Sequence, residues 1–312
     1  MSHHISLPQQ QMFQQSRFSP ARRENLVGYL FMSPWLFGFF VFTVGPVIVS
    51  LYLSLTSYDL FTPPEFIGLD NYIRLLSRDR RYADSLVVTG TYVLISVPLR
   101  LIFALAMAMI LNRKIGGLPI YRAIYYLPSL LGGSVAIAIL WRQVFGAEGL
   151  VNQALALVGI QGPSWIGSPD TALITLIVLG VWQFGSPMII FLAGLKQIPE
   201  TLYEAAEIDG ANGLQKFLRV TIPLLTPIIF FNLIMQLISS FQAFTPAYII
   251  SGGTGGPANA TMFYTLYLYQ QGFTFFRMGY AAAIAWVLLA IIAIFTGVNF
   301  MASRLWVFYG DD

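Results

Sequence analysis

The chain has 312 residues, of which 56% are apolar and only 10% charged, and its formal net charge is +3. Soluble domains carry roughly 25% charged residues, so this composition is typical of a protein with several membrane spans. The absence of cysteine excludes disulfides, thiolate nucleophiles and cysteine-ligated metals. His3 and His4 are the only histidines, which excludes histidine acid–base catalysis beyond the N-terminus. The basic residues are scattered beside apolar runs, so no nucleic acid partner is expected.

The first 24 residues are rich in Gln and Ser and end in a small group of arginines, Arg17, Arg22 and Arg23. A cleaved signal peptide is not expected, because the next apolar run begins too late and is too long for the apolar core of a signal. We therefore expect residues 1–24 to form a flexible cytoplasmic tail.

Six apolar runs follow, and each is near or above the ~20 residues that cross the hydrocarbon core of a bilayer. They are 27–55, 86–111, 121–145, 171–195, 222–250 and 280–301. Prolines inside the first, second and fifth runs predict kinks, which membrane helices tolerate where neighbours bind the freed carbonyls. The sequence predicts an all-α membrane protein with six transmembrane helices and a short cytoplasmic tail at 306–312.

The basic residues between the runs favour placing both termini inside the cell. With that orientation the inner side holds ten of them: Arg17, Arg22, Arg23, Arg113, Lys114, Arg122, Lys196, Lys216, Arg219 and Arg304. The outer side holds six: Arg74, Arg78, Arg80, Arg81, Arg142 and Arg277. Most of the outer group lies in 70–84, where arginines alternate with aspartates, and this pattern predicts a salt-bridged surface helix capped by Asp70.

A polar insert at 204–223 separates the fourth and fifth runs and lies in the cytoplasm in this orientation. Pro199 suits a first helical turn, Gly210 suits a helix end, and Asn212 can cap a second helix. The insert is therefore expected to form two short helices with an apolar patch of small residues and an acidic rim. Such a pair can dock another protein or pack only on its own bundle.

The spacing within this insert resembles the EAA loop of ABC importer permeases. Glu204, Ala205 and Ala206 are followed by Gly210 six residues after the glutamate, and then by 220–223, Val-Thr-Ile-Pro. The family pattern ends in Ile-x-Leu-Pro, so Val220 and Ile222 are mild departures. The stretch 203–211 and the pieces 66–72, 121–129, 190–199 and 255–257 resemble the carbohydrate-uptake branch, the relatives of maltose and glycerol-phosphate permeases. The resemblance covers about residues 25–305.

This resemblance implies a type I ABC importer permease fold with both termini inside and an EAA loop at about 196–221. It implies four kinds of partner in a bacterial plasma membrane: a second permease, two cytoplasmic ATPase subunits, an extracytoplasmic solute-binding protein and lipid. It implies no catalysis and no cofactor of the chain's own, since ATP and Mg would be bound by the ATPases. The absence of a Gly-Lys pair, and so of a Walker A motif, agrees with this division. The implied ATPase-docking residues are Glu204, Ala205, Ala206, Asp209 and Gly210.

Polar side chains inside membrane runs are costly unless they face a cavity or one another, so they are candidates for a solute pathway. The fourth run offers Gln183 and Ser186, and the fifth offers Asn232, Gln236, Ser239 and Ser240 at helical spacing. The resemblance places Ser186, Ser239 and Ser240 nearest the sugar contacts of maltose-type permeases. Hydrogen bonding between helices is the alternative role for all of them.

Arg100 is the one charge deep inside a run, too far from either end for its side chain to reach water easily. It could contact an acidic or phosphorylated solute, such as glycerol phosphate, or bond structurally to carbonyls freed by Pro98 or to a partner subunit. A stand-alone secondary transporter is disfavoured, because it would need a buried carboxylate and the six runs contain no Asp or Glu. A membrane-embedded enzyme is disfavoured because the runs offer serines without a base.

Overall fold

The computed structural model describes residues 20–113 and 117–308, and these divide into two units that meet at Tyr52 and Leu53. The predicted tails fall largely outside these ranges, as does Lys114. The first unit is one helical stretch made of α1 (Pro20–Phe39), the π-helical η1 (Phe40–Val44) and α2 (Gly45–Ser54). Helix α1 therefore takes in the last residues of the segment expected to be a tail. The π turn ends two residues before Pro46, which has no N–H to donate to a helical bond.

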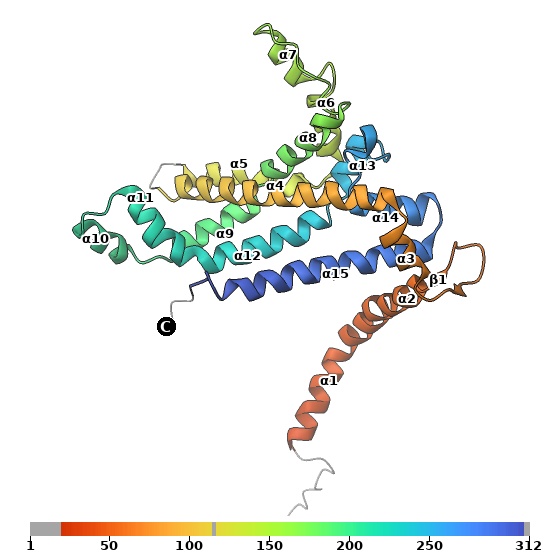
Figure 1. The fold of residues 1–312 in the computed structure, drawn as a ribbon. Helices are drawn as coiled ribbons and strands as arrows, with labels where there is room; N and C mark the ends of the chain where they lie inside the picture. The colour runs from red at the N-terminus through yellow and green to blue at the C-terminus, as the bar shows by residue number, and fades with distance from the viewer. Residues whose placement is uncertain (1–19, 114–116, 309–312) are drawn as a thin grey trace, which may run out of the picture. The chain divides into compact units, whose positions relative to one another are not determined.

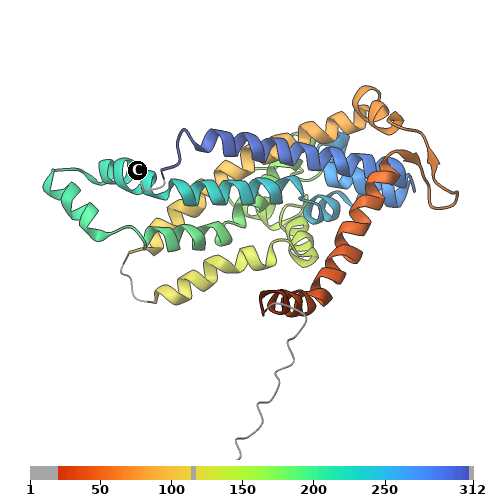
Figure 2. The ribbon, with the colours of Figure 1, turned by 90° about the horizontal axis from the view of Figure 1, so that it is seen from below.

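The second unit is a helical bundle with one pair of very short antiparallel strands, β1 (Thr56–Ser57) and β2 (Glu65–Phe66). Its first half contains α3 (Asp70–Ser77), α4 (Arg80–Leu111), α5 (Leu118–Leu131), α6 (Val135–Val144), α7 (Leu150–Ala156), α8 (Pro169–Trp182) and α9 (Gly185–Leu195). Its second half contains α10 (Glu200–Ile208), α11 (Gly213–Lys216), η2 (Phe217–Thr221), α12 (Ile222–Phe241), α13 (Thr245–Ser251), η3 (Pro257–Asn259), α14 (Tyr264–Tyr269), η4 (Gln270–Thr274) and α15 (Met278–Ser303). Figures 1 and 2 show α4, α12 and α15 side by side.

The predicted membrane spans are confirmed by length and composition, with one change. Five helical stretches can cross a bilayer: Val27–Ser54, Arg80–Leu111, Pro169–Leu195, Gly213–Ser251 and Met278–Ser303. The third predicted span is not one continuous helix, because α5 and α6 meet at an angle of 98°. The bend falls at Gly132, Gly133 and Ser134, where two glycines favour a break and Ser134 caps the next helix.

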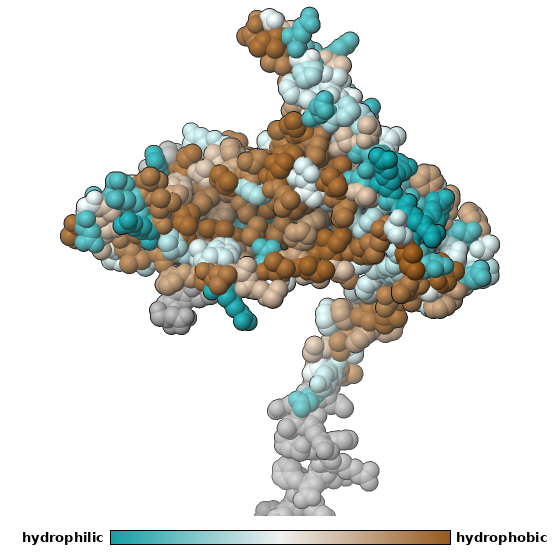
Figure 3. Space-filling view, in the orientation of Figure 1, coloured by the Kyte–Doolittle hydropathy of each residue, from teal (hydrophilic) through white to brown (hydrophobic). Residues whose placement is uncertain are grey.

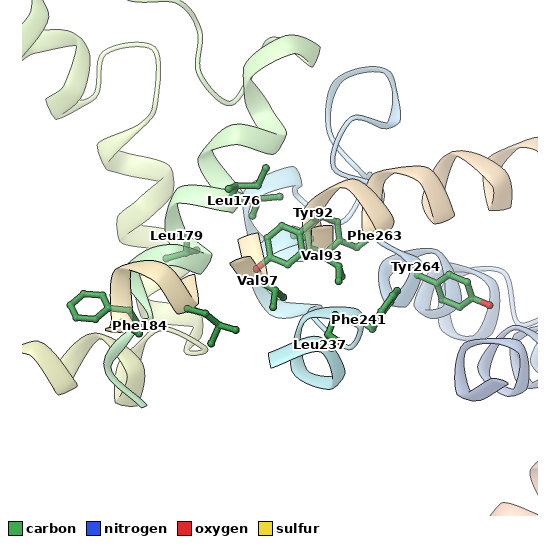
Figure 4. Close-up of a cluster of buried hydrophobic side chains, with 14 of the residues drawn as sticks. Tyr92, Val93, Val97, Leu176, Leu179, Phe184, Leu237, Phe241, Phe263 and Tyr264 are labelled. Atoms are coloured by element: carbon green, nitrogen blue, oxygen red, sulfur yellow. The ribbon is translucent and has the colours of Figure 1, made fainter. Parts of the chain in front are cut away.

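Helix α4 lies at the centre of the core of the second unit. Tyr92, Val93 and Val97 on α4 are buried among large side chains of the helices around it (Figure 4). The neighbours drawn there include Leu176, Leu179, Phe184, Leu237 and Phe241. Burying side chains of this size contributes about 1.5–3 kcal/mol each by transfer from water, though between membrane helices close packing carries more of the gain.

The predicted salt-bridged helix over 70–84 is wrong in its boundaries and its cap. Helix α3 ends at Ser77, and Asp79 rather than Asp70 caps a helix, accepting a hydrogen bond from the Tyr82 N–H at 3.0 Å. The Asp79 carboxylate also accepts hydrogen bonds from the Tyr267 and Tyr280 hydroxyls. Among the described residues the one ion pair is Lys216–Glu207, so the expected Arg–Asp bridges do not form.

Candidate coupling surface and solute pathway

The insert between α9 and α12 folds as the two short helices that the sequence predicts. Pro199 directly precedes α10, and Gly210 ends it with a left-handed φ of +76°, which favours glycine. Asn212 begins α11 with a capping box, in which its side chain accepts from the Gln215 N–H at 2.9 Å and the Gln215 side chain accepts from its N–H at 2.8 Å. The conformation of this segment is therefore determined by interactions between residues close together in the sequence.

The insert presents a mixed apolar and acidic surface to solvent. Of the predicted docking residues, Glu204, Ala205, Asp209 and Gly210 are exposed and Ala206 is half-buried. Beside them lie exposed large apolar side chains, with Ile208 87% and Leu214 66% exposed. Exposed leucine and isoleucine beside small residues mark a surface that a partner can cover.

One contact holds the two helices of the insert together, and another holds the insert against the start of α12. Lys216 forms an ion pair with Glu207 at 2.9 Å, which ties α11 to α10. The Tyr203 and Thr221 hydroxyls lie 2.9 Å apart, which holds α10 against the start of α12. The helical path from Gly213 through η2 into α12 then continues into the core. A displacement of the insert would therefore be carried by α12.

The two pathway candidates on the fourth span lie at a break in that span, between α8 and α9. The Gln183 Nε2 donates to the Gly132 carbonyl at 3.2 Å, and the Ser129 Oγ donates to the Gln183 carbonyl at 2.9 Å. The Ser186 N–H donates to the same Ser129 Oγ at 2.9 Å. The Gln183 amide is therefore used to join this break to the bend between α5 and α6.

The candidates on the fifth span do not share one environment. Asn232 is 0% exposed and Ser240 is buried, whereas Gln236 is half-buried and Ser239 is exposed. Gln236 accepts a hydrogen bond from the Arg100 guanidinium Nη1 at 2.5 Å, which links α12 to α4. The structure thus brings Arg100 and the fifth-span residues together and keeps the fourth-span residues in a separate cluster.

We call the buried and half-buried polar residues of α4 and α12 the polar seam. They are Ser96, Arg100, Asn232, Gln236 and Ser240. The two helices run in opposite directions (Figure 1), so Ser96 and Ser240 both lie one turn from the Arg100–Gln236 bond, towards the α3 end. Ser96 Oγ, Arg100 Nε, Ser240 Oγ and both polar atoms of Asn232 have no protein partner. Buried polar atoms are nearly always hydrogen-bonded, so this seam is suited to water or a polar solute.

Sequence reasoning missed two residues of this region, Ser96 and Gly180. Ser96 precedes Arg100 by one helical turn, a spacing that could have identified it. Gly180 on α8 leaves space for the seam, since a Cβ there would lie 2.7 Å from Tyr92 Oη and 2.9 Å from Arg100 Nη2. No local signal in the sequence distinguishes this glycine from the others.

A separate cavity of about 730 Å³ lies between α4, α5 and α8 and is almost wholly apolar. Its lining includes the aromatic side chains Phe103, Tyr125, Trp182 and Phe184. Aromatic faces can pack against the C–H faces of sugars, but few polar atoms are present to bind hydroxyls. No group of three or more metal-ligating side chains occurs in the described part of the chain.

A bundle of membrane-spanning helices with an exposed helical insert is the arrangement expected of a membrane transport subunit. Similarity to known proteins identifies the family. The profile of the family described as "Binding-protein-dependent transport system inner membrane component" matches residues 81–306. The chain belongs to this family, and it is a non-catalytic, multi-pass component of the inner membrane.

Named relatives are similar over nearly their whole lengths. The chain is 57% identical to the probable ABC transporter permease protein YesP of Bacillus subtilis over 289 residues, covering 92% of this chain and 94% of the relative. It is 34% identical to the lactose transport system permease protein LacF of Rhizobium radiobacter, covering 93% and 98%. It is 33% identical to the trehalose/maltose transport system permease protein MalF of Thermococcus litoralis, covering 90% and 95%.

Solved structures support the fold. The chain matches a subunit of a bacterial ABC transporter involved in the import of the acidic polysaccharide alginate with a TM-score of 0.74 and 22% identity, covering 91% of this chain and 97% of that one. A second structure, of an alginate ABC transporter in complex with an alginate pentasaccharide-bound periplasmic protein, matches with a TM-score of 0.76 and 20% identity, covering 93% and 98%. The predicted ABC importer permease fold is confirmed, whereas the orientation of the termini stays a prediction.

Proposed function

We propose that this chain is the permease subunit of an ATP-driven importer for a sugar or sugar-like solute. A solute-binding protein delivers the solute from outside, and two ATPase subunits bind the insert from the cytoplasm. The observation that carries the proposal is the exposed insert, with its EAA spacing and its rigid connection through α12 to the polar seam. The sugar transport named for LacF and MalF supports the substrate class.

A second permease subunit completes the assembly. The span Val27–Ser54 is compatible with this partner, because it is long and apolar enough to cross the bilayer. A long apolar helix can pack against another subunit or against lipid. Both termini and the insert lie on the cytoplasmic side in this arrangement.

The coupling mechanism follows from the contacts of the insert. When the ATPases close on ATP, they move α10 and α11, and the Tyr203–Thr221 contact and the continuous helix carry this motion into α12. The polar seam then shifts against α4, and the bundle changes from inward-facing to outward-facing. Glu204 would pair with an ATPase arginine, while Ala205 and Ala206 allow close approach and Asp209 with Gly210 shapes the turn.

Co-purification with a co-expressed ATPase subunit tests this function, and Gly210→Pro is the decisive variant. Proline cannot adopt the φ of +76° at Gly210, and it would also remove the N–H that bonds to the Glu207 carbonyl at 3.0 Å. We expect the variant to lose the ATPase. Gly213→Ala is the matched control, since its Cβ would meet nothing within 4 Å. An ATPase complex that tolerates Gly210→Pro would overturn the proposed role of the insert.

The seam also supports a second candidate substrate class, an acidic or phosphorylated sugar or polyol. Arg100 is buried, its Nε has no partner, and its one hydrogen bond is to a neutral amide. Its charge is therefore available to an anionic group. Replacing Arg100 with Gln should then abolish uptake of an acidic oligosaccharide while the transporter still assembles. Loss of assembly instead would show that Arg100 has a structural role.

A further inference from the structure

A basic cavity lies at the end of the bundle opposite the insert, where α3, α4, η4 and α15 meet (Figure 1). Its volume is about 320 Å³. We call its four basic side chains the arginine pocket: Arg74, Arg78, Arg81 and Arg277. Neither the coupling mechanism nor the solute pathway uses these residues.

The protein balances the charges of the arginine pocket only in part, because its lining has four arginines and one carboxylate, that of Asp79, which interacts electrostatically with Arg74. Asp79 lies in the same cavity, but its oxygens already accept hydrogen bonds from two tyrosine hydroxyls and a backbone N–H. No arginine of the pocket forms an ion pair with a described residue, the one such pair being Lys216–Glu207. Arg74 lies over the Tyr280 ring at 4.9 Å, and Arg277 lies over the Phe275 ring at 5.9 Å and makes a long 3.5 Å hydrogen bond to Gln271. The pocket therefore offers several guanidinium donors to an anion.

An apolar ridge on α3 adjoins the pocket. Leu69, Ile73 and Leu76 recur at helical spacing and are exposed, with Leu76 70% exposed, while Leu75 on the opposite face is buried. A second cavity, of about 670 Å³, shares Arg74 and Arg78 and adds Ile67 and Ile73, together with Asp70, Asn71 and Ser57. Figure 3 shows hydrophilic and hydrophobic residues next to one another at this end of the bundle.

The pocket adjoins the end of a candidate membrane span. The candidate span that contains α4 begins at Arg80, so α3 and Arg78 directly precede it, and lipid headgroups lie near the ends of such a span. Exposed aromatic side chains, Phe61, Phe66 and Phe275, occur at the same end. Aromatic rings are enriched at the boundary between membrane and water.

We propose that the arginine pocket binds the phosphate of an anionic phospholipid, whose acyl chain lies along the ridge on α3. Guanidinium groups bind phosphate oxygens in a bidentate manner, and a helix with a basic and an apolar face suits an interfacial position. An acidic patch on a protein would satisfy the arginines but would not require the exposed ridge. This inference depends only on the membrane location of the chain.

Lipid retention by the purified transporter, measured by native mass spectrometry, tests the site. The protein is extracted from vesicles with equal amounts of phosphatidylglycerol and phosphatidylcholine. We expect phosphatidylglycerol to be retained preferentially, and Arg78→Gln with Arg81→Gln to weaken its retention roughly fivefold for each arginine. Neither side chain makes a hydrogen bond or ring contact within the described part of the chain, so their replacement removes no hydrogen bond of Asp79, although Arg81 interacts electrostatically with Tyr267.

Two further variants keep the test specific. Arg142→Gln removes an exposed arginine in the last turn of α6, away from the pocket, and should leave retention unchanged. Leu76→Gln on the ridge should weaken retention of both lipids. Equal retention of the two lipids by the unaltered protein would overturn the proposal, as would undiminished phosphatidylglycerol in the double variant. A double variant that keeps its lipid but no longer binds the solute-binding protein would assign the pocket to protein docking instead.

Discussion

The missing side chain of Gly180 allows α8 to pack closely against the polar seam. A methyl group there would lie 2.7 Å from Tyr92 Oη and 2.9 Å from Arg100 Nη2, both shorter than a normal contact. We expect Gly180→Ala to destabilise the protein by about 1–3 kcal/mol, the usual cost of overpacking a filled core. Thermal unfolding in detergent measures the effect, and Gly90→Ala on α4 is the control, because its Cβ would meet nothing within 4 Å. Equal melting temperatures for the two variants would contradict the prediction.

Asp79 should make stability depend on acid pH. Burial alone would raise the pKa of this carboxyl, but hydrogen bonds from Tyr267, Tyr280 and the Tyr82 N–H outweigh burial and lower the pKa below its ordinary 3.8. A lowered folded-state pKa contributes stability above the unfolded-state pKa, and this contribution is lost as the pH falls through the folded-state pKa. The melting temperature of the wild type should therefore approach that of Asp79→Asn below about pH 4. A constant difference between the two proteins through this range would show that the carboxylate charge is not responsible.

At the scale of the element, the sharp bend between α5 and α6 depends on Gly132. The Gln183 side chain fills the space beside it, so a Cβ at position 132 would lie 2.2 Å from Gln183 Cγ and 2.7 Å from the Pro128 carbonyl oxygen. Gly132→Ala should displace Gln183, break its hydrogen bond to the bend and lower the unfolding free energy by about 1–3 kcal/mol. In Gly133→Ala, one residue away, the added Cβ would meet nothing within 4 Å, so the unfolding free energy should hardly change. Thermal unfolding of both variants tests this prediction. Similar losses of stability in the two variants would contradict the proposed role of Gly132 in the bend.

Elements controlled by neighbouring residues were predictable from the sequence, whereas those controlled by distant residues were not. The insert was predictable because Gly210, Asn212 and Gln215 act within a few residues of one another. The cap of α4 was missed although Asp79 bonds to the Tyr82 N–H only three residues on, whereas the contacts of its carboxylate with Tyr267 and Tyr280, far along the chain, have no local signal. The bend at 132–134 had a Gly-Gly-Ser signal, but apolar length alone favoured one straight span.

At the scale of the whole molecule, the polar seam includes residues of α12, the helix that leads from the insert, so under the proposed function it would connect a motion of the insert to the solute path. Asn232 and Arg100 were identifiable as polar residues in apolar runs, but only the packing of α4 on α12 shows that they share one seam. Their transport roles stay predictions, as do those of Gln183, Ser186, Ser239 and Ser240. The Gln183 side chain is already committed to the Gly132 carbonyl, which favours a structural role for it.

The variant Asn232→Leu distinguishes a role of Asn232 in the solute pathway from a role in hydrogen bonding between helices. Both polar atoms of Asn232 have no protein partner, so a leucine of similar volume removes no hydrogen bond within the chain. We expect unchanged or slightly raised thermal stability, with solute uptake by the reconstituted transporter reduced at least about tenfold. Met235→Leu, on an exposed face of α12, is the control. Normal uptake by Asn232→Leu would remove this residue from the pathway.

The end of the described chain returns to the base of α12. The Phe308 N–H donates to Thr226 Oγ1 at 2.9 Å, and the Trp306 ring meets Phe230 with centroids 6.1 Å apart. Trp306 and Phe308, in the segment expected to be a short cytoplasmic tail, therefore contact the helix that leaves the insert. A fluorescent label placed just beyond Phe308 would follow the movement of α12 during turnover. An affinity tag joined there without a spacer would instead pull on that same helix.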